Sequence, residues 1–323
     1  MQGNMKTIGV LTSGGDAPGM NAAIRAVVRA GIAKGFRVVG IRRGYKGLLE
    51  GDTEGLNLRS VSNILQSGGT LLYTSRCPEF MEKEGVRAAA DYCREIGIDA
   101  LVAIGGDGTF RGALELAREG VPCIGIPGTI DNDIAASDYT IGFDTAVNTV
   151  VQMVDRVRDT SRSHDRCCVV EVMGRHAGYI ALESGIACGA IAILVPEHPF
   201  DFDEIAETMM STLNTGKKNF IIVTAEGAAR AHEVALEIES RTNIETNEVV
   251  LGYVQRGGSP TAMDRTIASR MGCRAVELIA ADKYNRVVVR QNGIVTDLDM
   301  ESALGMKKTI DPEMLRVATA VSI

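Results

Sequence analysis

Short apolar runs alternate with longer amphipathic segments along almost the whole chain. The stretches Met20–Lys34 and Phe143–Val157 carry apolar residues at helical spacing. The strand-like runs are Thr7–Leu11, Arg37–Ile41, Ala100–Ile104, Cys123–Ile126, Cys167–Val172, Ala192–Val195, Phe220–Ala225 and Val249–Val254. Because strands that alternate with helices are typical of βαβ units, the pattern predicts an α/β fold with mostly parallel sheets.

Three glycine-rich loops directly follow three of the predicted strands. Residues 13–19 read SGGDAPG, residues 105–109 read GGDGT, and residues 127–133 read PGTIDND. In such sheets, ligands bind beyond the carboxyl ends of the strands. We therefore expect all three loops to face one cleft.

The loops have the composition of a phosphate site. Glycine lets backbone N–H groups approach an anion, and a helix that follows adds positive potential. Each loop taken alone is equally compatible with a tight turn, but three at neighbouring strand ends favour phosphate. No GxxxxGK[ST] sequence occurs, so this is not a P-loop. A dinucleotide fingerprint is excluded too, because Gly112 comes one residue too late.

Carboxylates in the same loops add catalytic chemistry. Magnesium prefers one or two carboxylates together with phosphate and water oxygens, a role that suits Asp107. A kinase also needs a base near the attacking hydroxyl, and Asp131 and Asp133 are the candidates. We expect one of that pair to be structural. A lone His such as His176 is more often structural than catalytic.

Composition limits the possible partners. The chain has 323 residues, more than one core usually organises, so two lobes are expected. With 34 basic and 41 acidic residues, its net charge of −7 argues against nucleic acid or an anionic membrane as a partner. The seven Cys lack metal-ligand spacing and indicate reduced thiols. Without signal-peptide or membrane-spanning patterns, a cytoplasmic location is expected.

Six motifs, read in order, resemble those of the bacterial-type ATP-dependent 6-phosphofructokinase family over nearly the whole chain. They are LTSGGDAPGMNAAIR (11–25), IGGDGT (104–109), GIPGTIDND (125–133), DYTIGFDTA (138–146), EVMGRHAG (171–178) and QRGGSP (255–260). The resemblance implies that ATP phosphorylates fructose 6-phosphate at its 1-hydroxyl, a glycolytic reaction that yields fructose 1,6-bisphosphate and ADP.

The resemblance also implies the site residues. Asp131 is the expected base, Thr129 lies beside the transferring phosphoryl group, and Arg175 neutralises its developing charge. Mg²⁺ is expected on Asp107. The residues expected at the ATP phosphates are Gly15, Arg76, Cys77, Gly106, Asp107, Gly108 and Thr109. Those expected at the sugar phosphate are Thr129, Asp131, Arg166, Met173, Gly174, Arg175, Glu226, Asn247, Tyr253 and Arg256.

The family architecture has two lobes, each a mostly parallel sheet with helices on both faces, and the active site in the cleft between them. Carried onto this chain, the larger ATP-binding lobe covers residues 1–141 and 254–304. The smaller sugar-phosphate-binding lobe covers 142–253 and 305–323. Arg166 is expected to reach across from a neighbouring subunit, which implies a homotetramer with active sites shared between subunits.

Gly108 and Gly128 indicate the phosphoryl donor. The pyrophosphate-using branch of the family typically has Asp and Lys at these positions. A carboxylate and an ammonium group there would occupy the space of the ATP α-phosphate. Glycines leave that space open, so the sequence favours ATP.

Two positions depart from the family pattern on the acceptor side. Asn247 and Tyr253 stand where the family usually has Arg and His. Replacing a charge-assisted hydrogen bond by a neutral one loses about 1 kcal/mol. Two such losses are expected to weaken sugar-phosphate binding on the order of 10- to 100-fold.

The family's effector site is matched in part, and we expect effector control to be weakened or changed. Taken without the resemblance, Arg25 and Arg29 would be a solvated helix face. Ile191 stands where an acidic magnesium-contacting residue is expected. The matching residues are Arg25, Arg29, Arg158 and Lys217.

Two alternatives stand beside fructose 6-phosphate kinase activity. One is a kinase for a related acceptor such as sedoheptulose 7-phosphate, suggested by Asn247 and Tyr253. The other is a non-catalytic sensor of nucleotides or sugar phosphates with the same fold. A sensor would be free to lose Asp107, Asp131 and Arg175, and all three are present.

Overall fold

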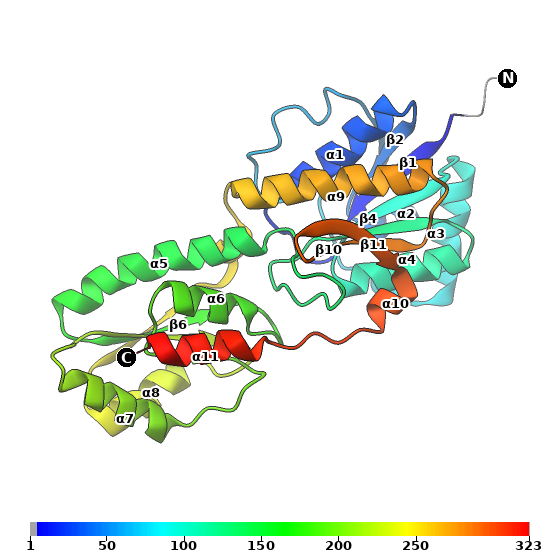
Figure 1. Cartoon of the computed structure of the whole chain (residues 1–323). Coiled ribbons are helices and arrows are strands. Elements are labelled where there is room, and N and C mark those ends of the chain that lie inside the picture. The colour runs from blue at the N-terminus through cyan, green and yellow to red at the C-terminus, as the bar shows by residue number, and fades with distance from the viewer. Residues whose placement is uncertain (1–4, 323) are drawn as a thin grey trace. The chain divides into compact units, whose positions relative to one another are not determined.

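The computed structural model describes residues 5–322 and contains two compact units (Figure 1). Unit 1 contains the residues up to Thr129, Ile134–Asp144 and Arg256–Lys308. Unit 2 contains Ile130–Asp133, Thr145–Gln255 and the residues from Thr309 onward. No helix within residues 5–322 is long and apolar enough to cross a bilayer.

Unit 1 is built on a seven-stranded sheet with the order β11-β10-β5-β4-β1-β2-β3. Strands β10, β5, β4, β1 and β2 run parallel, and β3 and β11 pair antiparallel at the two edges. The central strands are buried along their whole length, as expected for a parallel sheet covered on both faces. The strands are β1 (Thr7–Thr12), β2 (Arg37–Ile41), β3 (Thr53–Leu56), β4 (Ala100–Gly105), β5 (Cys123–Pro127), β10 (Arg286–Gln291) and β11 (Ile294–Asp299).

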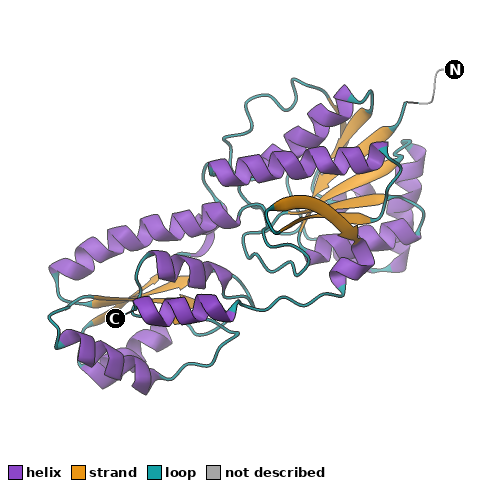
Figure 2. Cartoon of the chain, viewed as in Figure 1, coloured by secondary structure: helices purple, strands orange, loops and turns teal. Residues whose placement is uncertain are grey.

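Helices cover the unit 1 sheet, as Figure 2 shows. One core cluster joins the sheet to α2, α3 and α4 and includes Leu101 and Phe110. Helices α1 and α9 pack directly against each other. The helices of this unit are α1 (Met20–Ala33), α2 (Tyr45–Glu50), the 3₁₀ turn η1 (Pro78–Met81), α3 (Lys83–Glu95), α4 (Asp107–Arg118), α9 (Ala262–Ala280) and α10 (Met300–Leu304).

Unit 2 has a smaller, fully parallel sheet with the order β7-β8-β6-β9. Its core includes Val169, Phe220 and Ile238. The strands are β6 (Cys167–Val172), β7 (Ala192–Leu194), β8 (Phe220–Ala225) and β9 (Thr246–Val250). The helices are α5 (Phe143–Ser163), α6 (Tyr179–Ala187), α7 (Phe202–Leu213), α8 (Ala231–Thr242), the 3₁₀ turn η2 (Gly252–Arg256) and α11 (Pro312–Val321).

The α/β class with mostly parallel sheets is confirmed, and one predicted strand is wrong. Of the apolar run 249–254, only the beginning is strand, because β9 ends at Val250 and η2 begins at Gly252. Gly252 has φ 51°, and the Gln255 side chain donates to its carbonyl, which stabilises the turn.

The units divide at 144/145, 255/256 and 308/309, and residues 130–133 group with unit 2. Assigning ATP to one unit and sugar to the other stays a prediction.

The contact between α1 and α9 depends on a glycine. A Cβ atom at Gly272 would lie 2.6 Å from Ala26 Cβ and 2.9 Å from the Ala23 carbonyl oxygen. We predict that Gly272→Val separates the two helices and costs about 1–3 kcal/mol of stability. The loss will appear as a lower melting temperature by calorimetry. Gly305→Ala is the matched control, because a Cβ there meets nothing closer than 3.5 Å. An unchanged melting temperature for Gly272→Val would contradict the packing.

Candidate active site

The three glycine-rich loops follow β1, β4 and β5, which are neighbours in the sheet. Backbone hydrogen bonds join them. Ser13 N donates to the Ile104 carbonyl at 3.0 Å, and Gly128 N donates to the Gly105 carbonyl at 2.9 Å. The parts of these loops that belong to unit 1 therefore lie side by side, and their facing one cleft stays a prediction.

Gly105 lies where the loops are closest. A Cβ atom there would lie 2.4 Å from the Ser13 carbonyl oxygen and 2.3 Å from Thr109 Oγ1. The Thr109 hydroxyl is buried and donates to the Ser13 carbonyl at 3.1 Å. This hydroxyl therefore ties the first loop to α4.

The first turn of α4 has open space beside it. A Cβ atom at either Gly106 or Gly108 would meet no atom within 4 Å. Asp107 is the first residue of the helix and is half-buried. A helix N-terminus with open glycines and a carboxylate suits a phosphate that shares a cation with the protein.

Gly128 has a different environment. A Cβ atom there would lie 3.1 Å from Met20 Cε and 3.2 Å from Ile104 Cγ2. A side chain would therefore have to displace part of the core. The glycine at 128 has a packing reason of its own, whereas Gly108 borders open space, as the donor hypothesis requires.

Arg256 contacts the first loop. Its Nη1 donates to the Asp16 carbonyl at 3.1 Å, and a Cβ atom at Gly15 would lie 2.5 Å from the same nitrogen. All three residues belong to unit 1. In this structure, the guanidinium expected at the sugar phosphate contacts the loop expected to bind ATP.

Arg76 and Cys77 precede η1 at the edge of this region. Arg76 is exposed, and Cys77 packs partly against the core cluster below α2. Burial raises the pKa of the Cys77 thiol, so it stays protonated.

Tyr45 is a residue that the sequence did not indicate. It stacks on Phe80 at 4.0 Å between ring centroids, and its hydroxyl donates to the Thr109 carbonyl.

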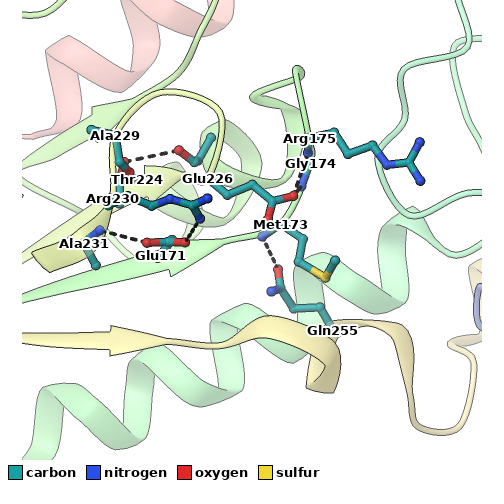
Figure 3. A network of polar contacts seen from close by, with 11 residues as sticks. Glu171, Met173, Gly174, Arg175, Thr224, Glu226, Ala229, Arg230, Ala231 and Gln255 are labelled. Carbon is teal, nitrogen blue, oxygen red and sulfur yellow. Dashed lines mark hydrogen bonds and ion pairs between the residues drawn. The ribbon is translucent and has the colours of Figure 1, made fainter. Parts of the chain in front are cut away.

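In unit 2, the loop after β6 is fixed by polar side chains, as Figure 3 shows. Glu226 Oε1 accepts from Gly174 N at 3.2 Å and from Arg175 N at 2.9 Å. Gln255 is fully buried and accepts from Met173 N at 3.2 Å. The Arg175 side chain is exposed and extends away from these contacts. Side chains therefore hold the backbone of this loop, while the Arg175 guanidinium stays exposed.

Buried Glu171, the next-to-last residue of β6, holds a different segment, the one that leads from β8 into α8. Its carboxylate accepts from Arg230 Nη1 at 3.0 Å and from Ala231 N at 2.8 Å. Gly227, which follows β8, allows a close contact with the loop after β6, because a Cβ atom there would lie 2.0 Å from the Arg175 carbonyl oxygen. No local pattern indicated Glu171, Arg230 and Gly227, because their partners are distant along the chain.

The third loop crosses from unit 1 to unit 2. Thr129 is in unit 1, where its carbonyl accepts from Thr140 Oγ1 at 2.6 Å. Asp131 is in unit 2 and is only 3% exposed, whereas Asp133 is exposed. The low exposure of Asp131 fits a base shielded from water better than does the solvated Asp133.

The expected sugar-phosphate residues Asn247 and Tyr253 are exposed, with Tyr253 at 84%. Arg166 is half-buried, and its Nε lies 2.8 Å from Glu245 Oε2. All of these residues are in unit 2. Of these three residues, Arg166 is held in an ion pair, whereas Asn247 and Tyr253 are neutral and in contact with solvent.

The four expected effector residues form two pairs, one in each unit. Arg25 and Arg29 line a pocket of about 340 Å³ in unit 1 that also includes Arg59. Arg158 donates to the Cys188 carbonyl in unit 2. Burial, followed by the charge of Arg158, lowers the pKa of the neighbouring Lys217.

Comparison with known proteins identifies the family. The family model described as phosphofructokinase matches residues 7–279. An ATP-dependent 6-phosphofructokinase of Clostridium botulinum is 51% identical over 98% of this chain and 100% of its own length. One of Clostridium tetani is 53% identical over the same shares. The phosphofructokinase structure from Saccharomyces cerevisiae aligns with a TM-score of 0.89 and 34% identity, covering 98% of this chain and 48% of that chain.

This chain therefore spans about half of that yeast chain but the full length of the two clostridial proteins. The match to the family model and the identity over nearly the full length lead to the same assignment, and the chain belongs to the phosphofructokinase family.

Proposed function

We infer that this chain transfers the γ-phosphoryl group of ATP to the 1-hydroxyl of fructose 6-phosphate, producing fructose 1,6-bisphosphate and ADP in glycolysis. The observation that carries the inference is the junction of the three glycine-rich loops at the ends of β1, β4 and β5, in a chain of this family. The names of the clostridial relatives support ATP as the donor.

On the donor side, the open first turn of α4 receives the ATP phosphates. Asp107 fits Mg²⁺, because that ion takes one or two carboxylates and fills its other positions with phosphate and water oxygens. Within residues 5–322, no group of three or more His, Cys, Asp or Glu side chains could hold a metal ion. Held by Asp107, Mg²⁺ would supply positive charge that offsets the charge of the phosphates.

On the acceptor side, Asp131 takes the proton from the attacking hydroxyl. The Arg175 guanidinium stabilises the charge that develops on the transferring phosphoryl group. Glu226 and Gln255 hold the backbone of the Arg175 loop, so the main chain that carries this cation is in place before substrate binds. Phosphoryl transfer depends mainly on such positioning and electrostatics.

Asn247 and Tyr253 bear on which sugar phosphate accepts the phosphoryl group. Asn247 and Tyr253 are neutral and exposed, which favours a weak fructose 6-phosphate site or a related acceptor such as sedoheptulose 7-phosphate. A homotetramer in the cytoplasm, in which Arg166 leaves its partner Glu245 to serve a neighbouring subunit, belongs to the same proposal.

The first prediction concerns the acceptor. Purified protein with ATP and Mg²⁺ will release ADP when fructose 6-phosphate is supplied at millimolar concentration. The measurement is coupled ADP release over a panel of sugar phosphates that includes sedoheptulose 7-phosphate. Turnover with another sugar alone would refute the choice of acceptor, and no turnover with any sugar would favour the sensor.

The second prediction concerns the base. Asp131→Asn is expected to lower kcat on the order of 10²- to 10⁴-fold, because the amide cannot accept the proton. ATP binding, measured by calorimetry, is expected to stay within about twofold of the unmodified protein. Asp133→Asn is the matched control and is expected to keep most of the activity. Comparable losses in both variants would contradict the assignment of Asp131.

The third prediction concerns the sugar-phosphate pocket. The double variant Asn247→Arg/Tyr253→His introduces a guanidinium and an imidazole as donors and is expected to lower KM for fructose 6-phosphate by about 10- to 100-fold. KM for ATP is expected to stay unchanged, because the donor loops are not altered. Steady-state kinetics with each substrate varied in turn will test this. An unchanged KM for fructose 6-phosphate would show that these positions do not contact its phosphate.

A further inference from the structure

Asp264 is a fully buried carboxylate in the first turn of α9. It is not needed as a helix cap, because the Thr261 side chain already accepts from Asp264 N. Burying a carboxylate is costly unless hydrogen bonds compensate. Its contacts therefore indicate what the charge does.

Asp264 Oδ1 accepts two hydrogen bonds from the segment 139–142. The Tyr139 hydroxyl donates at 2.6 Å, and Gly142 N donates at 2.7 Å. Burial, and then the charge of Asp264, raise the pKa of Tyr139 far above its usual value, so the phenol keeps the proton that it donates. The carboxylate thus fixes both ends of a short segment that has no regular secondary structure of its own beyond one bridge.

That bridge joins the segment to the third glycine-rich loop. Ile141 N donates to the Pro127 carbonyl at 3.0 Å, and Thr129 N donates to the Ile141 carbonyl at 3.1 Å. Thr140 Oγ1 donates to the Thr129 carbonyl at 2.6 Å. Residues 127–129 are therefore held from one side by β4 and from the other by the segment that Asp264 fixes.

The same residues reach the end of the first loop. A Cβ atom at Gly19 would lie 2.7 Å from Ile141 Cγ2 and 3.4 Å from Asp264 Cβ. Gly19 has φ 102° and directly precedes α1. Within unit 1, Ile141 therefore contacts both the first and the third loop, and Asp264 packs beside the first loop at Gly19.

We propose that Asp264, through Tyr139 and Gly142, is a positioning residue for Thr129 and thereby for the catalytic loop that continues to Asp131. The inference rests on the proposed function, because Thr129 and Asp131 act in that reaction. Asp264 touches neither substrate, and its effect passes through the backbone of residues 139–142.

A graded set of variants tests this. Tyr139→Phe removes one of the two hydrogen bonds, Asp264→Asn keeps an acceptor oxygen without the charge, and Asp264→Ala removes both bonds. We expect kcat to fall least for Asp264→Asn and on the order of 10- to 100-fold for Asp264→Ala, with KM for ATP nearly unchanged. Asp297→Ala is the matched control, because Asp297 pairs with Arg274 of α9 and Arg286 of β10, away from the loops.

A purely structural role predicts a different result. In that case each variant lowers the melting temperature while kcat per folded molecule stays within about twofold of the unmodified protein, and this outcome overturns the proposal. An equal fall of kcat in Asp297→Ala overturns it as well. If Asp264→Ala does not fold, the test uses Tyr139→Phe and Asp264→Asn instead. An unchanged kcat in both of these variants overturns the positioning role of Asp264.

A readout independent of turnover separates this inference from the proposed function. Hydrogen exchange of peptides that cover residues 127–142 is expected to accelerate in the Asp264 and Tyr139 variants and not in Asp297→Ala. If the unmodified protein phosphorylates no sugar, the proposed function fails while exchange still tests the support of the loop. Unchanged exchange at residues 127–142 overturns the positioning role whatever the activity.

Discussion

The close approach of backbone around Gly105 is the constraint on which the arrangement of the glycine-rich loops in unit 1 depends. The carbonyls of Ile104 and Gly105 bind the first and third loops, and the space that a Cβ would need is taken by the Ser13 carbonyl and Thr109 Oγ1. Any side chain at 105 would separate the loops. Because neighbouring parallel strands end at one edge, this single glycine lets three loops present backbone to the same place.

Unit 2 fixes its loop after β6 by other means. Side chains from distant segments hold the backbone there, with Glu226 at the end of β8 and Gln255 in the turn after β9. A carboxylate that binds two N–H groups orders the loop and still leaves the Arg175 guanidinium exposed. Backbone contacts suit loops that bind phosphates with N–H groups, whereas side-chain anchors suit a loop that must present a cation.

The sequence predicted the order of the loops and most of the strands, because apolar runs and glycine spacing are local signals, but it missed β3, β10 and β11. A sequence does not show where a side chain points or which distant residue it contacts. The motif around Arg256 indicated the sugar phosphate, yet its guanidinium contacts the Asp16 carbonyl. Gly128 was interpreted as space for ATP, whereas a Cβ there would meet Met20 in the core. Tyr45 and Asp264 gave no local pattern because their partners are distant in sequence.

Asn247 and Tyr253, the two residues that depart from the family pattern, differ from substitutions in a protein core because both are exposed. A buried residue is constrained by packing, so a change there must be compensated by its neighbours. Asn247 and Tyr253 are exposed, and substitutions at such positions usually change folding stability little. Asn247 lies in β9 and Tyr253 in η2, and neither side chain belongs to the buried core. In the proposed function, what changes is therefore the positive charge offered to the sugar's own phosphate, while the groups that transfer the phosphoryl group are all retained.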